Sequence, residues 1–551
     1  MQHDEHPAGL RQSHKRSGAT LWTVVALTVF YVSEAAHAQD YRTIDGYGNN
    51  IANPTWGTPS AHLLRSASGA YYADGIASPA GATRPSPREI SNAVFTQNDA
   101  LIPARGGQSD FMWTWGQFLD HDLGLTEGTA ENFPIDIPAG DAFFDPQGTG
   151  TKTMPFRRAI FDAATGRSTS NPREQINEVT GYIDGSMVYG SDGARAAWLR
   201  SGPYLKVSSG NLLPHNDGTQ PNAGTPEKPN LSPELFVAGD IRANEQPTLA
   251  AMHTLFVREH NYQVDRIRKA KPSLDDEELY QRARQIVIAE IQHVTYEEYL
   301  PALLGRGGLH TTRRYDAGAN PGLSSLFSTA AFRLGHTMLS SKVLRLKENG
   351  KSIEEGPFSL RDAFFEAAPP MLARHGIEPL IRGVAAQRMQ ELDNKIIDDV
   401  RNFLFGAPGA GGLDLIALNI QRGRDMGLPD FNTVRSDFGL PRKSSFSEIT
   451  SDRALATTLE QLYGNVDEID LFVGLLCEDD IRGTMLGETL RTILVDQFHR
   501  SRAGDRYWYT RTLKGKDLAM VHRTRLSDII RRNTSIRNIQ EDVFFVTKRD
   551  R

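Results

Sequence analysis

Beyond about residue 110, apolar side chains recur at helical spacing through most of the chain. The clearest run follows the sequence Ser273-Leu274-Asp275-Asp276, a typical helix start, and places positions 279, 283, 286, 287, 291 and 294 on one helical face. The same spacing predicts helices over 248–267, 389–404 and 484–500. Strand patterns are short and few, and loops rich in proline, glycine and asparagine separate the helices, as at 202–233 and 406–413. The pattern predicts a mainly α-helical protein with few short strands and long loops.

The helical patterns indicate one large domain preceded by an irregular segment. Residues 39–110 are rich in glycine, proline, alanine and asparagine, which predicts an irregular N-terminal arm wrapped over the surface. Residues 111–548 form the predicted core. No tandem repeat, charge block or long flexible linker divides them, so the sequence favours a single domain over the several that 551 residues would allow.

The first 38 residues are organised as a secretory signal peptide. A polar opening ends in His14-Lys15-Arg16, an apolar run covers 21–30, and Ala36-His37-Ala38 is a small-x-small cleavage signal before Gln39. The alternative is a membrane anchor, but the apolar run is shorter than the roughly 20 residues that a span needs. We therefore expect an exported protein, periplasmic or secreted, that keeps no membrane span after cleavage.

Charge and cysteine content narrow the classes of partner. The net charge is −6, and lysine and arginine are scattered rather than clustered, so nucleic acid is not an expected partner. The single cysteine, Cys477, cannot form an intramolecular disulfide, and its apolar neighbours predict a buried, inert thiol. Stability is then expected to come from the core and from bound ligands or metal.

The most informative motif is the segment 115–122, which sets a histidine between two carboxylates. On a helix, Gln117, Asp120 and His121 share one face, while Asp122 is turned about 100° away. One face of the helix would then present an amide, a carboxylate and an imidazole to a ligand. Asp122, on a neighbouring face, would be free to bind a second ligand beside the first. On its own, a histidine next to an aspartate in the sequence ordinarily has a structural role and no catalytic or binding role.

A second motif, at 180–186, carries oxygen ligands at alternate positions. The side chains of Thr180, Asp184 and Ser186 and the carbonyl of Tyr182 are suited to a hard cation such as calcium, with Asp122 as a second carboxylate. A half-buried strand with one polar face explains the same pattern. An EF-hand is excluded because its aspartate frame and terminal glutamate are missing.

Three further segments carry candidate binding residues. Arg242 and Glu245 stand one turn apart before a strong helix, which is also typical of a surface ion pair. His336 follows a glycine, which leaves room for a flat group, although a core histidine is the ordinary explanation. The segment 417–425 holds an amide and two guanidiniums that are able to orient an imidazole and pair with carboxylates.

Together and in this order, the motifs resemble the animal-type haem peroxidases, the superfamily of myeloperoxidase and peroxidasin. The resemblance runs from residue 41 to near Phe545 and includes Arg258-Glu259-His260-Asn261 and the segment 504–509. With its export signal and single cysteine, the chain looks like a bacterial, peroxinectin-like member. The resemblance implies one large helical haem-peroxidase domain.

The resemblance also implies a role for each candidate residue. His121 matches the distal histidine that moves a peroxide proton, Arg242 the arginine that stabilises charge as the O–O bond breaks, and Gln117 the distal amide that holds water or halide. His336 matches the haem iron ligand. The other matches are the hydrogen-bond acceptor of the ligand's second ring N–H (Asn419), the carboxylates esterified to haem methyls (Asp120 and Glu245), the groups near the propionates (Arg333, Arg422 and Thr126) and the calcium ligands (Asp122, Thr180, Tyr182, Asp184 and Ser186).

The implied function is an exported peroxidase with haem b, ester-linked, and one calcium ion. Hydrogen peroxide would oxidise the haem to an oxoferryl species, which would oxidise halides, thiocyanate or small aromatic donors. Gln246 stands where myeloperoxidase carries the methionine of a third haem link, so efficient chloride oxidation is not expected, and Gly124 replaces an acidic residue near a propionate.

Two rival functions remain at this point. A fatty-acid dioxygenase of the same superfamily would carry a tyrosine where this chain has Arg333. A non-catalytic adhesion or matrix protein would keep the fold without needing the complete set of haem residues.

Overall fold

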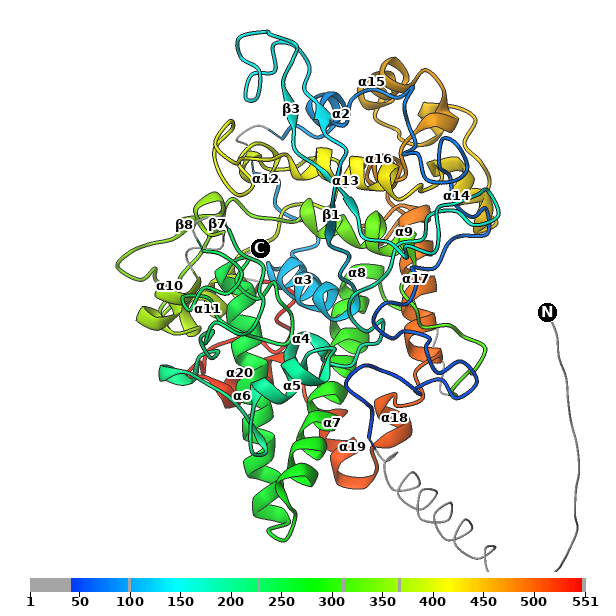
Figure 1. The fold of residues 1–551 in the computed structure, drawn as a ribbon. Helices are drawn as coiled ribbons and strands as arrows, with labels where there is room; N and C mark the ends of the chain where they lie inside the picture. The colour runs from blue at the N-terminus through cyan, green and yellow to red at the C-terminus, as the bar shows by residue number, and fades with distance from the viewer. Residues whose placement is uncertain (1–40, 98–100, 226–227, 310–313, 365–367, 548–551) are drawn as a thin grey trace, which may run out of the picture. The chain divides into compact units, whose positions relative to one another are not determined.

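The computed structural model describes residues 41–97, 101–225, 228–309, 314–364 and 368–547. The described residues from Thr43 onward form one compact unit dominated by helices, which confirms the predicted mainly helical class (Figure 1). The predicted signal peptide, residues 1–38, lies outside the described residues. In the part of the chain that is described, no helix is both long enough and apolar enough to cross a membrane.

Two long helices confirm the strongest sequence patterns. Helix α6, Pro247–Ala270, packs along α7, Asp276–Val294. Helix α7 begins where Asp275 accepts a hydrogen bond from the backbone N–H of Glu278, and acidic residues fill its first turn, where they favour the positive end of the helix dipole. The chain then continues through the π-helical turn η2, Thr295–Tyr299, into α8, Leu300–Leu304.

Helix α3, Phe111–Leu123, lies among other elements rather than at the surface. It packs against α6, against the short helix α4, Ser186–Tyr189, and against the 3₁₀ turn η3, Ala331–His336. Ten of its 13 residues are buried, as expected of a helix that is apolar on most sides. The polar residues of this helix are therefore enclosed by the elements that carry the other candidate site residues.

The strands form four two-stranded antiparallel ladders within the described residues. These are β1 Gly128–Asn132 with β4 Arg157–Ala159, β2 Ile135–Asp136 with β3 Thr153–Met154, β5 Arg200–Ser201 with β6 Tyr204–Leu205, and β7 Lys342–Val343 with β8 Phe358–Ser359.

The remaining helical elements are mostly short. The α-helices are α2 Pro87–Val94, α5 Gly193–Leu199, α9 Ser325–Thr329, α10 Ala368–His375, α11 Glu378–Ala386, α12 Asp398–Arg401, α13 Leu415–Asp425, α14 Phe431–Asp437, α15 Arg453–Tyr463, α16 Leu471–Cys477, α17 Glu488–Ala503, α18 Tyr509–Thr512, α19 Gly515–Val521 and α20 Leu526–Asn533. The 3₁₀ turns are η1 Ser209–Asn211, η4 Leu360–Asp362, η5 Phe446–Glu448 and η6 Val466–Glu468.

The helix predicted over 389–404 is wrong, because only α12 within it is helical. Residues 388–391 instead run extended beside the N-terminal segment. The backbone N–H of Met389 donates to the carbonyl of Gln108, and its carbonyl accepts from Ala104. A pairing with residues far away in the sequence therefore overrides the local helical spacing.

The helix predicted over 484–500 is confirmed with a later start. Thr484 lies in a turn in which the Ile481 N–H donates to the Leu486 carbonyl, and α17 begins at Glu488.

The N-terminal arm is mostly irregular, as predicted, but it does not lie only on the surface. Ser86 caps α2 and Pro87 occupies its first turn, where a proline loses no helical hydrogen bond. Ile90, Val94 and Phe95 are fully buried. The segment 41–110 therefore contributes to the core, because the spacing of these apolar residues places them on one side of a helix.

Candidate functional site

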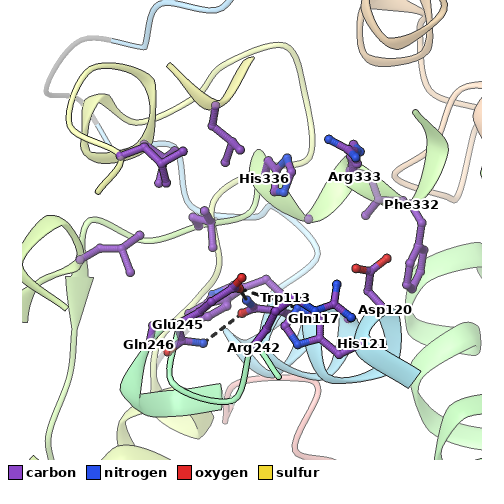
Figure 2. A pocket seen from close by; sticks show the side chains of 18 of the residues that line it. Trp113, Gln117, Asp120, His121, Arg242, Glu245, Gln246, Phe332, Arg333 and His336 are labelled. Atoms are coloured by element: carbon purple, nitrogen blue, oxygen red, sulfur yellow. Dashed lines mark hydrogen bonds and ion pairs between the residues drawn. The ribbon is translucent and has the colours of Figure 1, made fainter. Parts of the chain in front are cut away.

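A cavity of about 300 Å³ opens between α3 and η3. Figure 2 shows His336 and Arg333 on one side of it, and Gln117 and His121 of α3 on the other. Arg242 and Glu245, from the turn before α6, complete the polar wall. One edge is apolar and is formed by Leu339, Leu360, Phe364, Val400, Leu404, Phe405 and Leu415.

His121 is buried beside two carboxylates. Its Nδ1 lies 3.5 Å from Oδ1 of Asp240, and its Nε2 lies 3.7 Å from Oε2 of Glu245. Burial, together with the positive charge of Arg242, holds the pKa of His121 well below its ordinary value. The ring is therefore neutral at physiological pH, which is the form that accepts a proton.

Arg242 is fixed by a carboxylate that the sequence analysis did not single out. Its Nη2 donates to Oδ2 of Asp240 at 2.7 Å and to the carbonyl of Gly124 at 2.9 Å, and its Nε donates to Oδ1 of Asp240 at 2.9 Å. Burial alone would raise the pKa of Asp240, but Arg242 and His121 hold it below its ordinary value. The one sequence signal was the position of Asp240, two residues before the arginine.

A chain of amide hydrogen bonds crosses the polar wall. The backbone N–H of Thr248 donates to Oε1 of Gln246 at 2.7 Å, Nε2 of Gln246 donates to Oε1 of Gln117 at 3.1 Å, and Nε2 of Gln117 donates to Oε2 of Glu245 at 2.8 Å. Because a backbone N–H can only donate, it sets the orientation of both amides. The helix start of α6 thus directs the Gln117 amide nitrogen toward Glu245.

The two candidate ester carboxyls both line the cavity and hold their protons more tightly than usual. Burial raises the pKa of Asp120 to about 6, against the opposing charges of Arg242 and Arg333. Burial raises the pKa of Glu245 to about 7, again against Arg242. Both carboxyls are therefore partly protonated near neutral pH.

His336 contacts Asn419, as the resemblance implied, but the amide is turned the other way. Nδ2 of Asn419 lies 2.8 Å from Nδ1 of His336, while Oδ1 of Asn419 accepts from Nη1 of Arg333 at 2.7 Å. The guanidinium can only donate, so it takes the carbonyl oxygen and turns the amide nitrogen toward the ring. If His336 held iron through Nε2, its proton would be on Nδ1, and the Asn419 amide would have to turn its oxygen toward the ring. Burial and the charge of Arg333 lower the pKa of His336 to about 3, so this ring is neutral as well.

Of the three predicted propionate contacts, only Arg333 lines the cavity. Arg422 is bonded to Asp425 and to the Arg157 carbonyl, and the Thr126 hydroxyl donates to the Ile176 carbonyl. Burial, with the charge of Arg422, lowers the pKa of Arg333 to about 10. An anionic group at this edge of the cavity would relieve the repulsion between the two guanidiniums.

The predicted calcium ligands gather directly behind α3. The two Asp122 oxygens accept from the backbone N–H groups of Asp184 and Gly185 at 3.1 and 3.2 Å and from the Ser186 hydroxyl at 2.8 Å, and the Thr180 hydroxyl donates to Asp184 at 2.9 Å. Burial and the nearby Asp184 raise the pKa of Asp122 to about 7. Two buried carboxylates that repel each other, with hydroxyls beside them, fit a hard divalent cation.

Two further observations concern how well these residues are suited to bind a calcium ion. The Tyr182 hydroxyl donates to the Trp56 carbonyl, so the predicted contribution of Tyr182 is limited to its own carbonyl. Over the described residues, no group of three or more histidine, cysteine or acidic side chains is arranged to hold a metal ion. A cation here would therefore rely on two carboxylates completed by neutral oxygens.

Comparison with known proteins gives a family match over most of the chain. Residues 41–544 match the protein-family model described as animal haem peroxidase. Peroxinectin A of Dictyostelium discoideum is 36% identical over 529 residues, which is 92% of this chain and 96% of that protein.

Solved structures show the same likeness. Peroxidase A from Dictyostelium discoideum has a TM-score of 0.84 at 35% identity and covers 92% of this chain and 100% of its own. The fatty acid alpha-dioxygenase of Arabidopsis thaliana has a TM-score of 0.77 at 21% identity over 93% of this chain and 84% of its own, a likeness of fold alone.

Proposed function

Because this chain belongs to the animal haem peroxidase family and is a haem-dependent peroxidase, we propose that it uses hydrogen peroxide to oxidise halides, thiocyanate or small aromatic donors outside the cytoplasm. One observation carries the proposal: His121, Arg242 and Gln117 face one cavity from the side opposite His336. Export rests on the signal-like residues 1–38.

Each residue has a role set by its surroundings. His336 would hold the haem iron, and the haem would supply the redox chemistry. His121, a neutral base, takes the proton from one peroxide oxygen and returns it to the other. Arg242, fixed by Asp240, stabilises the negative charge that develops as the O–O bond lengthens. Arg333 would favour a haem propionate at its edge of the cavity, with the charge of Arg422 behind it.

The fold likeness to plant fatty acid dioxygenases does not favour that activity here. A dioxygenase of this superfamily needs an oxidisable phenol three residues before the proximal histidine, and Arg333 occupies that place with its guanidinium bonded to Asn419 and to the Ser328 carbonyl. Oxygen uptake with a fatty acid, in the absence of peroxide, should therefore stay at the level of the blank.

The donor preference is expected to follow from Gln246. Residue 246 is a glutamine whose amide is bonded to Thr248 and Gln117, and it has no thioether that could form a third, electron-withdrawing haem link. We predict that bromide and iodide are oxidised faster than chloride at neutral pH by at least about tenfold, equal to roughly 1.4 kcal/mol in the barrier.

Steady-state rates with chloride, bromide, iodide, thiocyanate and a phenol test this proposal. Equal turnover of chloride and bromide would contradict the role given to Gln246. If the protein turned over none of the five compounds, the proposed donor classes would be rejected.

The acidic cluster behind α3 is proposed to bind one calcium ion. Asp184→Ala removes one of its two carboxylates. Changing a group that only supports a metal ligand typically lowers metal affinity by roughly 10–100-fold, so removing a ligand should lower calcium affinity by at least as much. Haem occupancy and melting temperature should fall with it, because binding energy at such a site is part of folding energy.

Elemental analysis of wild type and variant checks this prediction. Asp470→Ala is a suitable control, since Asp470 is another buried carboxylate, paired with Arg424, outside the cluster. Active wild-type protein without calcium would reject the site.

A further inference from the structure

Asp240 is a buried carboxylate that lies behind the polar wall of the cavity. Its side chain is 1% exposed. Oδ1 accepts from the backbone N–H of Arg242 at 2.8 Å and from its Nε at 2.9 Å, and Oδ2 accepts from Nη2 at 2.7 Å. The two bonds to Nε and Nη2 fix the orientation of the guanidinium, as expected for a paired arginine fork, and the third holds the Arg242 backbone beside the same carboxylate.

The same carboxylate faces the inner nitrogen of His121. Nδ1 of His121 is buried and makes no hydrogen bond within the described residues; Oδ1 of Asp240 lies 3.5 Å away. At that distance the interaction is electrostatic, and a shift of a few tenths of an ångström would make it a hydrogen bond. An anion on this side favours the proton on Nδ1, which leaves the lone pair on Nε2.

Glu245 cannot replace Asp240 in this role. Its carboxylate lies 3.7 Å from Nε2, on the other edge of the ring, and it accepts the Gln117 amide. The two carboxylates therefore act on different nitrogens of His121: Glu245, which lines the cavity, on Nε2, and Asp240, which does not, on Nδ1.

The backbone at Asp240 is anchored to the element that also supports His121. The N–H of Asp240 donates to the carbonyl of Met187 in α4 at 3.0 Å. A Cβ at Gly239 would lie 2.6 Å from the backbone nitrogens of Tyr189 and Gly190, so only glycine permits this approach. Ser186 of the same helix donates to Asp122, the neighbour of His121. Asp240 and His121 are thus both tied to α4.

We propose that Asp240 is a positioning residue for both distal groups: it holds the guanidinium of Arg242 and directs the Nδ1 proton of His121 toward itself, so that Nε2 faces the cavity as the base. The proposal rests on the distal roles given above to His121 and Arg242. It adds to them the group that sets the tautomer of His121, in the way that an orienting carboxylate acts on a catalytic histidine.

Cyanide binding tests the proposal without any turnover. Hydrogen cyanide must lose its proton to bind haem iron, and His121 is the base placed to take it. Asp240→Asn keeps the size of the side chain, but its amide nitrogen is able to donate to Nδ1 and so to reverse the tautomer. We expect its cyanide association rate to fall by at least about tenfold, part of the roughly 10²–10⁴-fold that general acid–base catalysis contributes, with haem content and melting temperature measured alongside.

Asp470→Asn is the matched control. Asp470 is likewise buried and accepts from Nε and Nη2 of Arg424 at 3.0 and 2.7 Å, but it does not line the cavity. A purely structural carboxylate would lower the melting temperature and leave the cyanide rate unchanged, and this is what we expect of Asp470→Asn. An equal loss of rate in both variants would overturn the proposal.

A double-variant background shows whether Asp240 acts through its two partners. In His121→Ala/Arg242→Ala, adding Asp240→Asn should leave the cyanide rate unchanged, and a further loss would contradict the positioning role. A wild-type rate in Asp240→Asn alone would also overturn it. If Asp240→Asn does not take up haem, Asp240→Ser removes the same charge and is judged by the same criteria; failure of both to take up haem would assign Asp240 to stability alone.

Different results would reject the distal roles of His121 and Arg242 and the positioning role of Asp240. If His121→Ala bound cyanide at the wild-type rate, the distal base itself would be wrongly assigned. If His121→Ala were slow and Asp240→Asn normal, only the role of Asp240 would be rejected.

Discussion

His121→Ala should react with hydrogen peroxide about 10²–10⁴-fold more slowly than the wild type, because general acid–base catalysis contributes a factor of that size. The haem should remain bound, since His336, which contacts Asn419, lies on the other side of the cavity. Arg242→Ala should give a comparable loss, because it removes the positive charge opposite the developing anion. Stopped-flow absorbance of the haem-loaded protein measures both.

A second buried histidine provides the control for this result. His293 lies in α7, bonded to the Tyr509 hydroxyl, and does not line the cavity. His293→Gln should react with peroxide at the wild-type rate once its haem content is corrected for. Near-normal peroxide reactivity in His121→Ala would show that another group moves the proton.

The largest change expected in the bound cofactor follows from Asp120 and Glu245. After brief exposure to peroxide, acid–acetone should leave haem on the wild-type chain and extract it completely from Asp120→Asn/Glu245→Gln. Asp120 and Glu245 would each hold a haem methyl as an ester, in which a C–O bond replaces a C–H bond; peroxide would accept the two electrons and be reduced to water. Both carboxyls line the cavity in which the ring would lie.

The single variants divide this prediction between the two residues. Asp120→Asn and Glu245→Gln should each lose one link, and peptide mass spectra should locate the remaining haem on the other residue. Complete extraction of haem from the peroxide-treated wild type would contradict the covalent links and leave the peroxidase assignment intact.

Local spacing predicted the part of the site that lies on one element. Gln117 and His121 do share a face of α3, because side chains three and four residues apart on a helix lie together. Arg242 and His336 come from distant segments, and no local pattern placed them across a cavity; the family resemblance supplied that expectation.

The expectations that were wrong or missing all depended on long-range contacts. The start of the helix predicted over 389–404 is an extended pairing with residues 102–109, and only α12 within that range is helical. The orientation of Asn419 was set by Arg333, a neighbour only in the fold. Asp240 was missed because its importance depends on the close approach to α4 that Gly239 allows.

The most direct test of the account is the absorption spectrum of the full chain, purified with adequate haem, before and after mixing with hydrogen peroxide. We predict one haem per chain, a rapid change of the haem bands with peroxide, and their recovery when bromide or iodide is added. A colourless protein, or bound haem whose bands do not respond to peroxide, would contradict the central claim.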